Sequence, residues 1–166
     1  MVLTMSAAAQ ERKDCRMGTE SPAGKDAAAV VEEFFAAEMR YIAAGGAARG
    51  ADFGEMAALL HPEAVMHQGP SVPWPGDWRG IARLEEFFAL LSETWSAMDI
   101  TNVQHYRGVE GVAVSVVGKL TSRATGLTVH AEASHFITLR DGLIDDWTVF
   151  FLDPVTLSRT CGLSVG

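Results

Sequence analysis

Several features that mark common protein classes are scarce or missing in this chain of 166 residues. It has only two cysteines, near opposite ends, so neither a disulfide framework nor a cysteine metal site is expected. Lys and Arg number 13 against 21 Asp and Glu, without a basic cluster, so we expect no nucleic-acid or membrane partner. No apolar run is long enough to span a bilayer, and the first residues lack a signal-peptide pattern. We therefore expect a cytoplasmic protein.

The sequence also lacks the short motifs of several catalytic classes. Its five histidines show neither H-x-x-x-H nor H-x-H spacing, so we expect no metal site. No glycine-rich stretch follows a strand and opens a helix, as phosphate-binding loops do. Ser115 and Ser134 lie in no nucleophile-elbow context, which argues against covalent serine catalysis. We therefore expect chemistry without metal or cofactor.

The residues that are present indicate one domain with short tails. Residues 1–25 are small, polar and without period, which predicts a disordered N-terminal tail. Residues 26–158 carry the periodic patterns of a folded domain, and residues 159–166 are expected to be a C-terminal tail. Hydrophobic residues make up 48% of the chain and charged residues 20%, as in ordinary globular proteins.

Three helices are predicted in the first part of the domain. The first begins at Asp26, carries a broad apolar face and ends at Gly45 and Gly46. A second helix begins at Asp52 and is stopped by Pro62. The third runs over residues 81–95, with Leu, Phe and Trp at helical spacing.

Strands are predicted over residues 63–68, 99–108, 111–123, 127–140 and 143–152. Turn dipeptides fall at the three junctions between the long strands: Glu110-Gly111, Thr125-Gly126 and Asp141-Gly142. Consecutive hairpins imply a mostly antiparallel sheet. The order of elements predicts an α+β fold, a cone-shaped barrel in which three N-terminal helices pack on a curved sheet.

The strand over residues 127–140 has two different faces. One face carries His130, Glu132, Ser134 and Phe136, a mixture that suits either a pocket or a solvated surface. The other face carries Val129, Ala131, Ala133, His135, Ile137 and Leu139, which is nearly all apolar. This second face could pack on the core of the protein or on a second subunit.

The last strand decides between these alternatives for Glu132. If Trp147 and Phe151 lie beside Phe136, aromatic rings enclose the face that carries Glu132. Burial would raise the pKa of this carboxyl, because desolvation disfavours the charged form. A general acid/base works best with a pKa near neutrality. We therefore expect Glu132 to be the main carboxylate of the pocket.

Other candidate residues come from the helices and loops. Tyr41, on the apolar side of the first helix, is either a core residue or a hydrogen-bond donor to substrate. His67 and Gln68 end the first short strand, where a His is often only a surface residue. Trp74 and Trp78 either pack inward or form a lid over the pocket, because two exposed indoles are costly in water.

Six stretches resemble the SnoaL-like proteins and ketosteroid isomerases of the nuclear-transport-factor-2-like superfamily. They are Met39–Ile42, Leu59–His67, Trp74–Gly80, Phe87–Phe88, His135–Ile144 and Trp147–Pro154. The resemblance implies the cone-shaped fold and a homodimer. It implies less about activity, because one fold serves isomerases, cyclases, dehydratases, epoxide hydrolases and binding proteins.

The resemblance does not bring a complete catalytic set with it. Tyr41 falls where ketosteroid isomerases have their oxyanion-hole tyrosine, but Gln68 and Ser134 fall at the positions of their two aspartates. Limonene-type epoxide hydrolases have an Arg-x-Asp pair on a middle strand, where this chain has residues 114–119 without either residue type. These hydrolases also have an Asp on the last strand, and Val149 occupies the corresponding position in this chain.

The resemblance implies a cofactor-independent isomerase or cyclase that acts on an apolar, oxygenated molecule of polyketide or terpenoid type. Glu132 would move the proton, while Tyr41 and His67 would hydrogen-bond the oxygen that gains charge. The expected substrate-binding residues are Gln68, Trp74, Trp78, His130, Ser134, Phe136 and Trp147. Two alternatives are an epoxide hydrolase with altered residues and a non-catalytic domain that binds a small molecule.

Overall fold

The computed structural model describes residues 26–109 and 111–164. The predicted tail over residues 1–25 lies outside the described residues. The helices are α1 (Ala27–Ala43), η1 (Ala47–Arg49), α2 (Gly54–Ala57), α3 (Ile81–Thr94) and α4 (Pro154–Thr160). The strands are β1 (Leu60–Gln68), β2 (Gly76–Arg79), β3 (Trp95–Arg107), β4 (Gly111–Ser122), β5 (Thr128–Arg140) and β6 (Leu143–Phe151).

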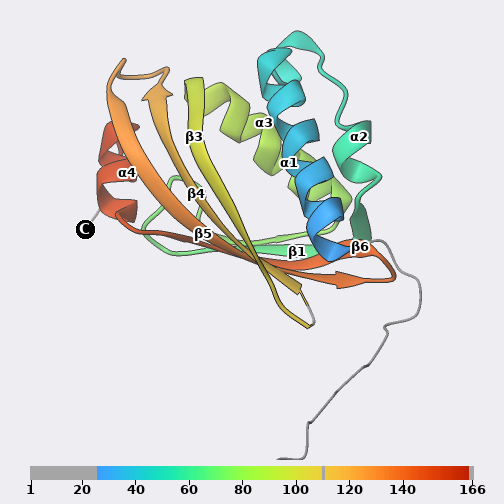
Figure 1. Ribbon diagram of the computed structural model, residues 1–166. Coiled ribbons are helices and arrows are strands. Elements are labelled where there is room, and N and C mark those ends of the chain that lie inside the picture. The colour runs from blue at the N-terminus through green and yellow to red at the C-terminus, as the bar shows by residue number, and fades with distance from the viewer. Residues whose placement is uncertain (1–25, 110, 165–166) are drawn as a thin grey trace, which may run out of the picture.

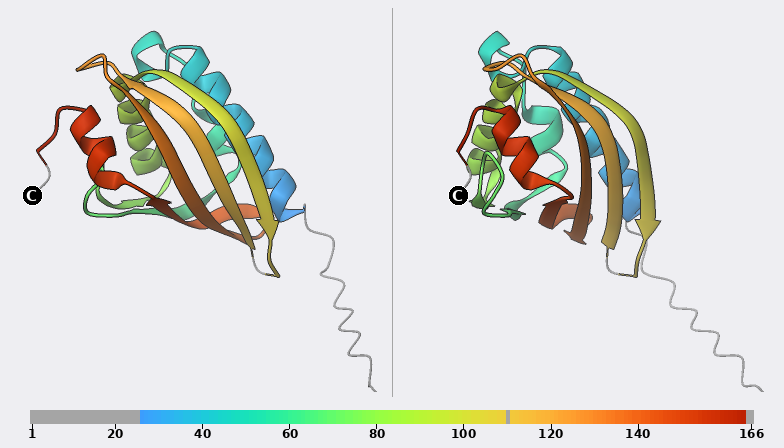
Figure 2. Two further views of the ribbon diagram at one scale, coloured as in Figure 1. Left: turned by 60° about the vertical axis from the view of Figure 1, so that its left-hand side comes forward. Right: turned by 90° about the vertical axis from the view of Figure 1, so that its left-hand side faces the viewer.

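The six strands form one curved sheet in the order β2-β1-β6-β5-β4-β3. Only the β1–β6 pair is parallel, and the other four pairs are antiparallel. Helices α1 and α3 lie on one side of the sheet, and the long strands β3, β4 and β5 bend over them (Figures 1 and 2). This arrangement confirms the predicted α+β fold with a cone-like sheet.

The first and third helices follow the apolar patterns of the sequence. The Asp26 side chain accepts a hydrogen bond from the Ala28 N–H at the start of α1, as an N-cap residue does. The buried side of α1 includes Val31, Phe34 and Tyr41. In α3, the buried stripe Leu84, Phe87, Phe88 and Leu91 faces the sheet. None of the helices in the described residues is long and apolar enough to cross a membrane.

Other predicted boundaries were wrong. The second helix is a single turn, and β1 already begins at Leu60, where the chain pairs with Ile144. Pro62 has no N–H to donate, and it lies where the β1–β6 pairing is interrupted, between Leu60 and Val65. Three elements were missed altogether: the short helix η1, the short strand β2 in the Trp/Pro loop, and α4, which was assigned partly to a tail. Asp153 caps α4 by accepting from the Thr156 N–H.

The β5–β6 hairpin contains the feature that decides which residues face inward. Asp141 and Gly142 both have positive φ, 54° and 76°, as the two central residues of a tight hairpin turn require. Arg140 pairs with Leu143, but the register then shifts, so that Leu139 pairs with Ile144 and Thr138 with Asp146. Asp145 is therefore one extra residue in β6, a β-bulge.

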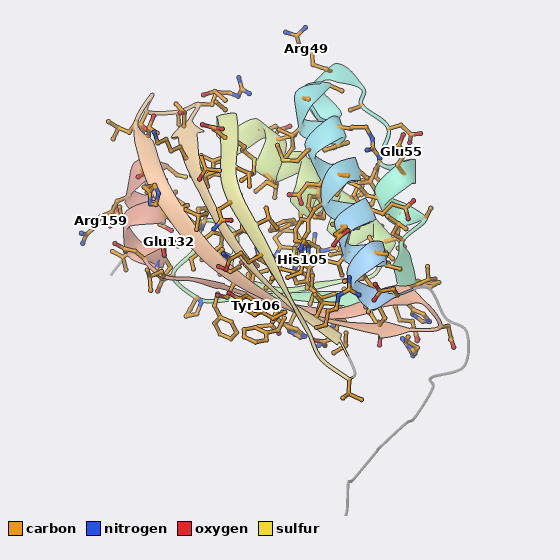
Figure 3. The ribbon with its side chains drawn as sticks, viewed as in Figure 1. Arg49, Glu55, His105, Tyr106, Glu132 and Arg159 are labelled. Atoms are coloured by element: carbon orange, nitrogen blue, oxygen red, sulfur yellow. The ribbon has the colours of Figure 1, made fainter. Side chains whose placement is uncertain are left out.

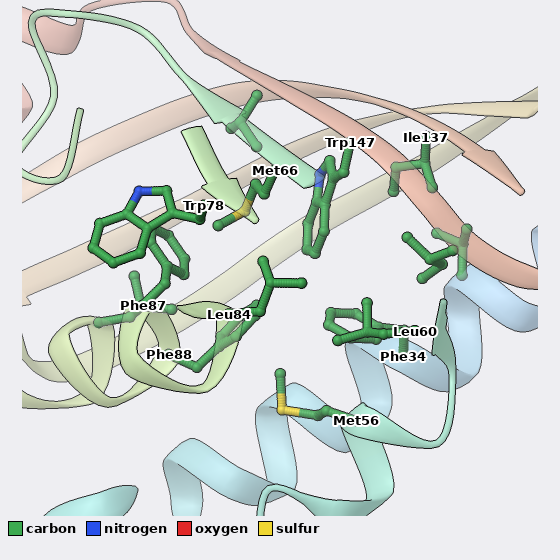
Figure 4. Close-up of a cluster of buried hydrophobic side chains, with 14 of the residues drawn as sticks. Phe34, Met56, Leu60, Met66, Trp78, Leu84, Phe87, Phe88, Ile137 and Trp147 are labelled. Carbon is green, nitrogen blue, oxygen red and sulfur yellow. The ribbon is translucent and has the colours of Figure 1, made fainter. Parts of the chain in front are cut away.

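A cluster of aromatic rings fills the space between the sheet and the helices (Figure 4). Trp147 of β6 meets Phe34 of α1 edge to face, with ring centroids 5.2 Å apart, and also contacts Phe88 of α3. Phe87 and Phe88 are in turn 5.2 Å apart at an angle of 87°. Such edge-to-face pairs contribute about 0.5–1.5 kcal/mol each beyond the burial of their area.

Candidate functional site

A cavity of about 150 Å³ lies between the concave face of the sheet and helices α1 and α3. Its lining is almost entirely aliphatic, aromatic or methionine side chains. Only Glu38, Gln68 and His135 bring a carboxyl, an amide or an imidazole to it. Such a cavity, mostly apolar with a few polar groups, is the usual form of a site for a small organic ligand.

Two of these polar residues share one row across the sheet. Gln68 of β1 lies opposite Val149 of β6, and Val149 lies opposite His135 of β5. The row continues through Val114 of β4 to His105 of β3. Because neighbouring strands are about 4.8 Å apart, the Gln68 and His135 backbones are roughly 10 Å apart. The row thus carries polar groups at three points along the concave face, and two of them, Gln68 and His135, line the cavity.

His135 is held by its neighbours in a neutral state. The Trp147 Nε1–H donates a hydrogen bond of 3.0 Å to His135 Nδ1, and the Phe35 ring meets the imidazole edge to face at 5.4 Å. Burial lowers the pKa of His135 to about 4, because the charged imidazolium loses its hydration. His135 is therefore uncharged at neutral pH.

Glu38 reaches the cavity from α1. Its side chain is partly accessible and forms no hydrogen bond or ion pair with the described part of the chain. Desolvation raises the pKa of the Glu38 carboxyl to about 8. At neutral pH this carboxyl is mainly protonated, and it exchanges a proton near physiological pH, as a general acid/base must.

Gln68 was predicted as a substrate-binding residue, and the structure places it on the cavity. Its Nε2–H is 3.8 Å from the Met66 sulfur, while its Oε1 atom is buried without a hydrogen-bond partner among the described residues. Trp74 and Trp147 also line the cavity, as predicted. Trp78 is buried against Phe87 but does not reach the cavity.

The expectation that aromatic rings enclose Glu132 was wrong. Its side chain is 49% exposed and lies on the outer face of β5, with His130, Ser134 and Phe136 (Figure 3). The bulge at Asp145 explains the error, because it pairs Trp147 with Ile137 and leaves Phe136 opposite Thr148. A shift of one residue exchanges the two faces of a strand.

Glu132 and His130 do border a second hollow, but it is small. This hollow of about 60 Å³ lies between β5 and the start of α4. The His130 Nδ1 and Glu132 Oε1 atoms are 4.0 Å apart, and both side chains are about half exposed. Water therefore surrounds this carboxylate, and the solvated interpretation of this face is the correct one.

His67 was expected at the pocket and instead lies on the outer face of the sheet. Its Nδ1 atom is 2.7 Å from Asp77 Oδ1, and its Nε2 atom is 3.1 Å from Asp146 Oδ2. The hydrogen bond with Asp77 contributes most to a raised pKa of His67, and Asp146 adds to it. Both ring nitrogens are thus already engaged, and the residue links β1 to β2 and β6.

Tyr41 is a core residue, and it does not line the cavity. Its ring is 4% exposed and packs against Phe53, with centroids 6.2 Å apart. Burial raises the pKa of its hydroxyl. The structure therefore brings together only part of the predicted site, with none of the three predicted catalytic residues in the cavity.

The nearly apolar face of β5 turns inward. It therefore packs on the core of the protein, which was one of its two predicted alternatives. Ala133 is 9% exposed and Ile137 only 1%. This face is therefore not available to a second subunit, and the homodimer stays a prediction. The outer face exposes other aromatic side chains, among them Tyr106, Phe136 and Phe150.

The two ionisable residues of the cavity were missed from the sequence. Glu38 interrupts the apolar side of α1, between Phe34 and Tyr41, and a carboxylate in such a stripe is a usable signal. His135 is the only polar residue on the inner face of β5, and its apolar neighbours on that face gave no sign of a site. Within the described residues, no group of three His, Cys, Asp or Glu is arranged to hold a metal ion.

Comparisons with solved structures show the same fold in proteins of low sequence identity. An NTF2-like protein from Burkholderia xenovorans is 20% identical, with a TM-score of 0.69 over 84% of this chain and 98% of that one. A candidate isomerase from Bacillus subtilis is 18% identical, with a TM-score of 0.66 over 84% and 94%. A candidate polyketide cyclase from Xanthomonas campestris is 17% identical, with a TM-score of 0.64 over 81% and 96%.

A comparison with curated proteins finds no match. The model of the SnoaL-like domain, however, matches residues 40–147, which is well over half of the chain. These residues include β1, α3 and most of the long strands that enclose the cavity. The chain belongs to the SnoaL-like domain family.

Proposed function

We propose that this protein is a cofactor-independent isomerase or cyclase that moves protons within a small, apolar, oxygenated molecule. The observation that carries the proposal is Glu38, a carboxyl group on an apolar cavity with its pKa raised to about 8. It replaces Glu132 as the acid/base residue, because Glu132 is in contact with water.

The chemistry requires one proton to leave the substrate and one to return. The Glu38 carboxylate removes a proton from a carbon next to a carbonyl group, and the electron pair moves toward the carbonyl oxygen. The neutral Glu38 carboxyl then gives the proton back at another atom, which completes an isomerisation. In a cyclisation, the carbanion would instead attack a second carbonyl group, whose oxygen takes the proton. A hydrogen-bond donor near the oxygen lowers the barrier, because charge develops there.

The related structures support this class of reaction. A candidate isomerase and a candidate polyketide cyclase are among the solved structures with the same fold. The apolar lining also fits, because it excludes water and strengthens each polar interaction inside it.

Epoxide hydrolysis is less well supported. The limonene-type mechanism would need charged residues on the inner face of the middle strand β4. The residues that β4 brings to the cavity are Val116, Gly118 and Leu120, none of which can position or activate a water molecule.

Exchange of substrate hydrogen for deuterium tests the proposal without the natural substrate. In D₂O, proton NMR would follow the loss of signal at the carbon between the ring and the carbonyl of phenylacetone. We expect Glu38→Gln to slow the exchange catalysed by the protein by about 10²- to 10⁴-fold. Since the carboxylate is the reactive form, the wild-type rate should rise with pH up to about 8 and then level off.

Glu132→Gln is the matched control, because it makes the same chemical change on the outer face. Its exchange rate should stay within about twofold of the wild type. If wild-type protein binds the ketone but gives no exchange above buffer, the cavity belongs to a non-catalytic binding domain. Equal exchange rates for Glu38→Gln and wild type would show that Glu38 is not the acid/base residue.

A further inference from the structure

Building on the proposed function, we propose that the cavity takes an uncharged ligand with a single ring, whose carbonyl oxygen accepts a hydrogen bond from the Nε2–H group of His135. Trp147 is the positioning residue that keeps this hydrogen on Nε2. Three observations carry the proposal: the Trp147–His135 hydrogen bond, the groups that line the cavity, and its size.

The hydrogen bond determines the tautomer of His135. The indole N–H of Trp can only donate, so Nδ1 of His135 must accept and carries no hydrogen. A neutral imidazole then has its one hydrogen on Nε2. Nε2 makes no hydrogen bond within the described part of the chain, and His135 lines the cavity. The site therefore presents a neutral donor of fixed identity.

The surrounding rings fix the direction of this donor. Trp147 is 3% exposed and contacts Phe34 and Phe35 edge to face, at 5.2 and 5.9 Å. The Phe35 ring is nearly perpendicular to the imidazole, at 86°. Because both neighbours are packed, the imidazole plane is held before a ligand arrives, which lowers the entropy lost on binding.

The lining also determines the charge of the ligand. Glu38 and His135 are its only ionisable residues, and burial moves the pKa of Glu38 up to about 8 and that of His135 down to about 4. Between these two values neither side chain is mainly charged. A carboxylate or an ammonium group in this cavity would lose its hydration without gaining a partner of opposite charge.

The volume sets the size of the ligand. An apolar cavity of about 150 Å³ holds one benzene ring, and this cavity has the same volume. The two most exposed of its lining residues are Met39 of α1, at 36%, and Val103 of β3, at 42%. A ring in the cavity could therefore carry a substituent that leaves between α1 and β3.

Three probes of nearly equal shape test the proposal at pH 7 by titration calorimetry. Acetophenone is neutral with a carbonyl, α-methylstyrene has a CH₂ group in place of that oxygen, and benzoate is charged. We expect acetophenone to bind and benzoate to bind at least about 100-fold more weakly. In wild-type protein, the carbonyl ¹³C resonance of labelled acetophenone should move downfield on binding, as it does when a carbonyl accepts a hydrogen bond.

Variants then test whether His135 is the group that donates the hydrogen bond to the ligand carbonyl. His135→Phe should weaken acetophenone binding about 5- to 20-fold, while α-methylstyrene binding does not weaken. Trp147→Phe keeps a ring but removes the N–H, so we expect a smaller loss, about 2- to 5-fold, and Nδ1-protonated imidazole in ¹⁵N spectra of His135. His130→Phe makes the same substitution on the outer face and should change neither affinity.

The proposal fails if benzoate binds as tightly as acetophenone, if neither neutral probe binds, or if the carbonyl resonance is unmoved. Equal losses for acetophenone and α-methylstyrene in His135→Phe would reduce His135 to a packing residue. The wild-type measurements decide the outcome even if a variant does not fold. Binding needs no proton transfer, so a failure of hydrogen exchange by Glu38 would leave these results intact, and the reverse holds too.

Discussion

The two faces of β5 differ in composition in the sequence and lie in opposite environments in the structure. Ile137 is 1% exposed on the inner face, whereas its neighbour Phe136 is 52% exposed on the outer face. His135 and His130 differ in the same way, one on the cavity and one in contact with water. The nearly apolar face is the buried one, and the single ring of Phe136 does not bring the mixed face into the core, because its partner on β6 is Thr148 and not Trp147.

Removing the bulge should remove the difference between the two faces of β5. Without Asp145, the regular hairpin register would place Phe136 opposite Trp147 and turn Ile137 outward. We expect deletion of Asp145 to abolish the cooperative fold, measured by near-ultraviolet circular dichroism and urea unfolding.

Asp145→Ala is the control for this deletion. It keeps the extra residue and loses the hydrogen bond that Arg140 Nη2 donates to Asp145 Oδ1 over 2.7 Å, together with the 3.6 Å contact between His61 Nδ1 and the same oxygen. This pair is partly exposed, so the loss should be below about 1 kcal/mol. A deletion variant as stable as Asp145→Ala would show that the bulge does not determine the faces.

Truncation of adjacent residues on β5 measures the same difference within the native register. Ile137→Ala removes a fully buried side chain and should lower the free energy of unfolding by about 2–4 kcal/mol, because a cavity remains. Phe136→Ala removes the larger but exposed ring, which contacts Phe150 at 6.0 Å, and should cost less than about 1 kcal/mol. Urea unfolding checks both values, and a reversed order would contradict the assignment of faces.

Histidines on the two sides of the sheet should respond to pH in opposite directions. The pKa of His135 is lowered to about 4, so the unfolded chain binds more protons between pH 6.5 and 4, and stability falls as pH decreases through that range. The pKa of His67 is raised, mainly by Asp77, so its contribution is complete below pH 6.5 and is lost as pH rises through the folded pKa.

Variants separate these two contributions. In wild-type protein the free energy of unfolding falls on acidification, and His135→Gln should make this fall smaller by about 1–3 kcal/mol. It also falls on the alkaline side, and His67→Gln should make that fall smaller by less than about 1 kcal/mol. Urea unfolding at pH 4.5, 6.5 and 8.5 measures both, and proton NMR titration of each imidazole checks the pKa directions. A midpoint for His135 above 6.5 would contradict its desolvation.

Much of the architecture followed from local chemistry. The apolar stripe of α3 and the Asp141-Gly142 turn led to correct elements, because side-chain period and turn conformation depend on neighbours in the chain. The site was harder to predict. Gln68, Trp74 and Trp147 reach the cavity as expected, whereas Tyr41 and His67 do not. His67 lies on the outer face of β1, whereas Tyr41 is on the buried side of α1 but packs against Phe53 away from the cavity.

The sequence by itself determined the order of the main helices and long strands, the family and the presence of an aromatic core. Only the tertiary structure decided that Glu38 and His135, and not Glu132, are the ionisable groups of the cavity. For the strand residues His135 and Glu132, the physical reason is the single extra residue in β6, because side chains alternate with a period of two and one inserted residue exchanges the two faces. The desolvation that shifts a pKa depends on that exchange.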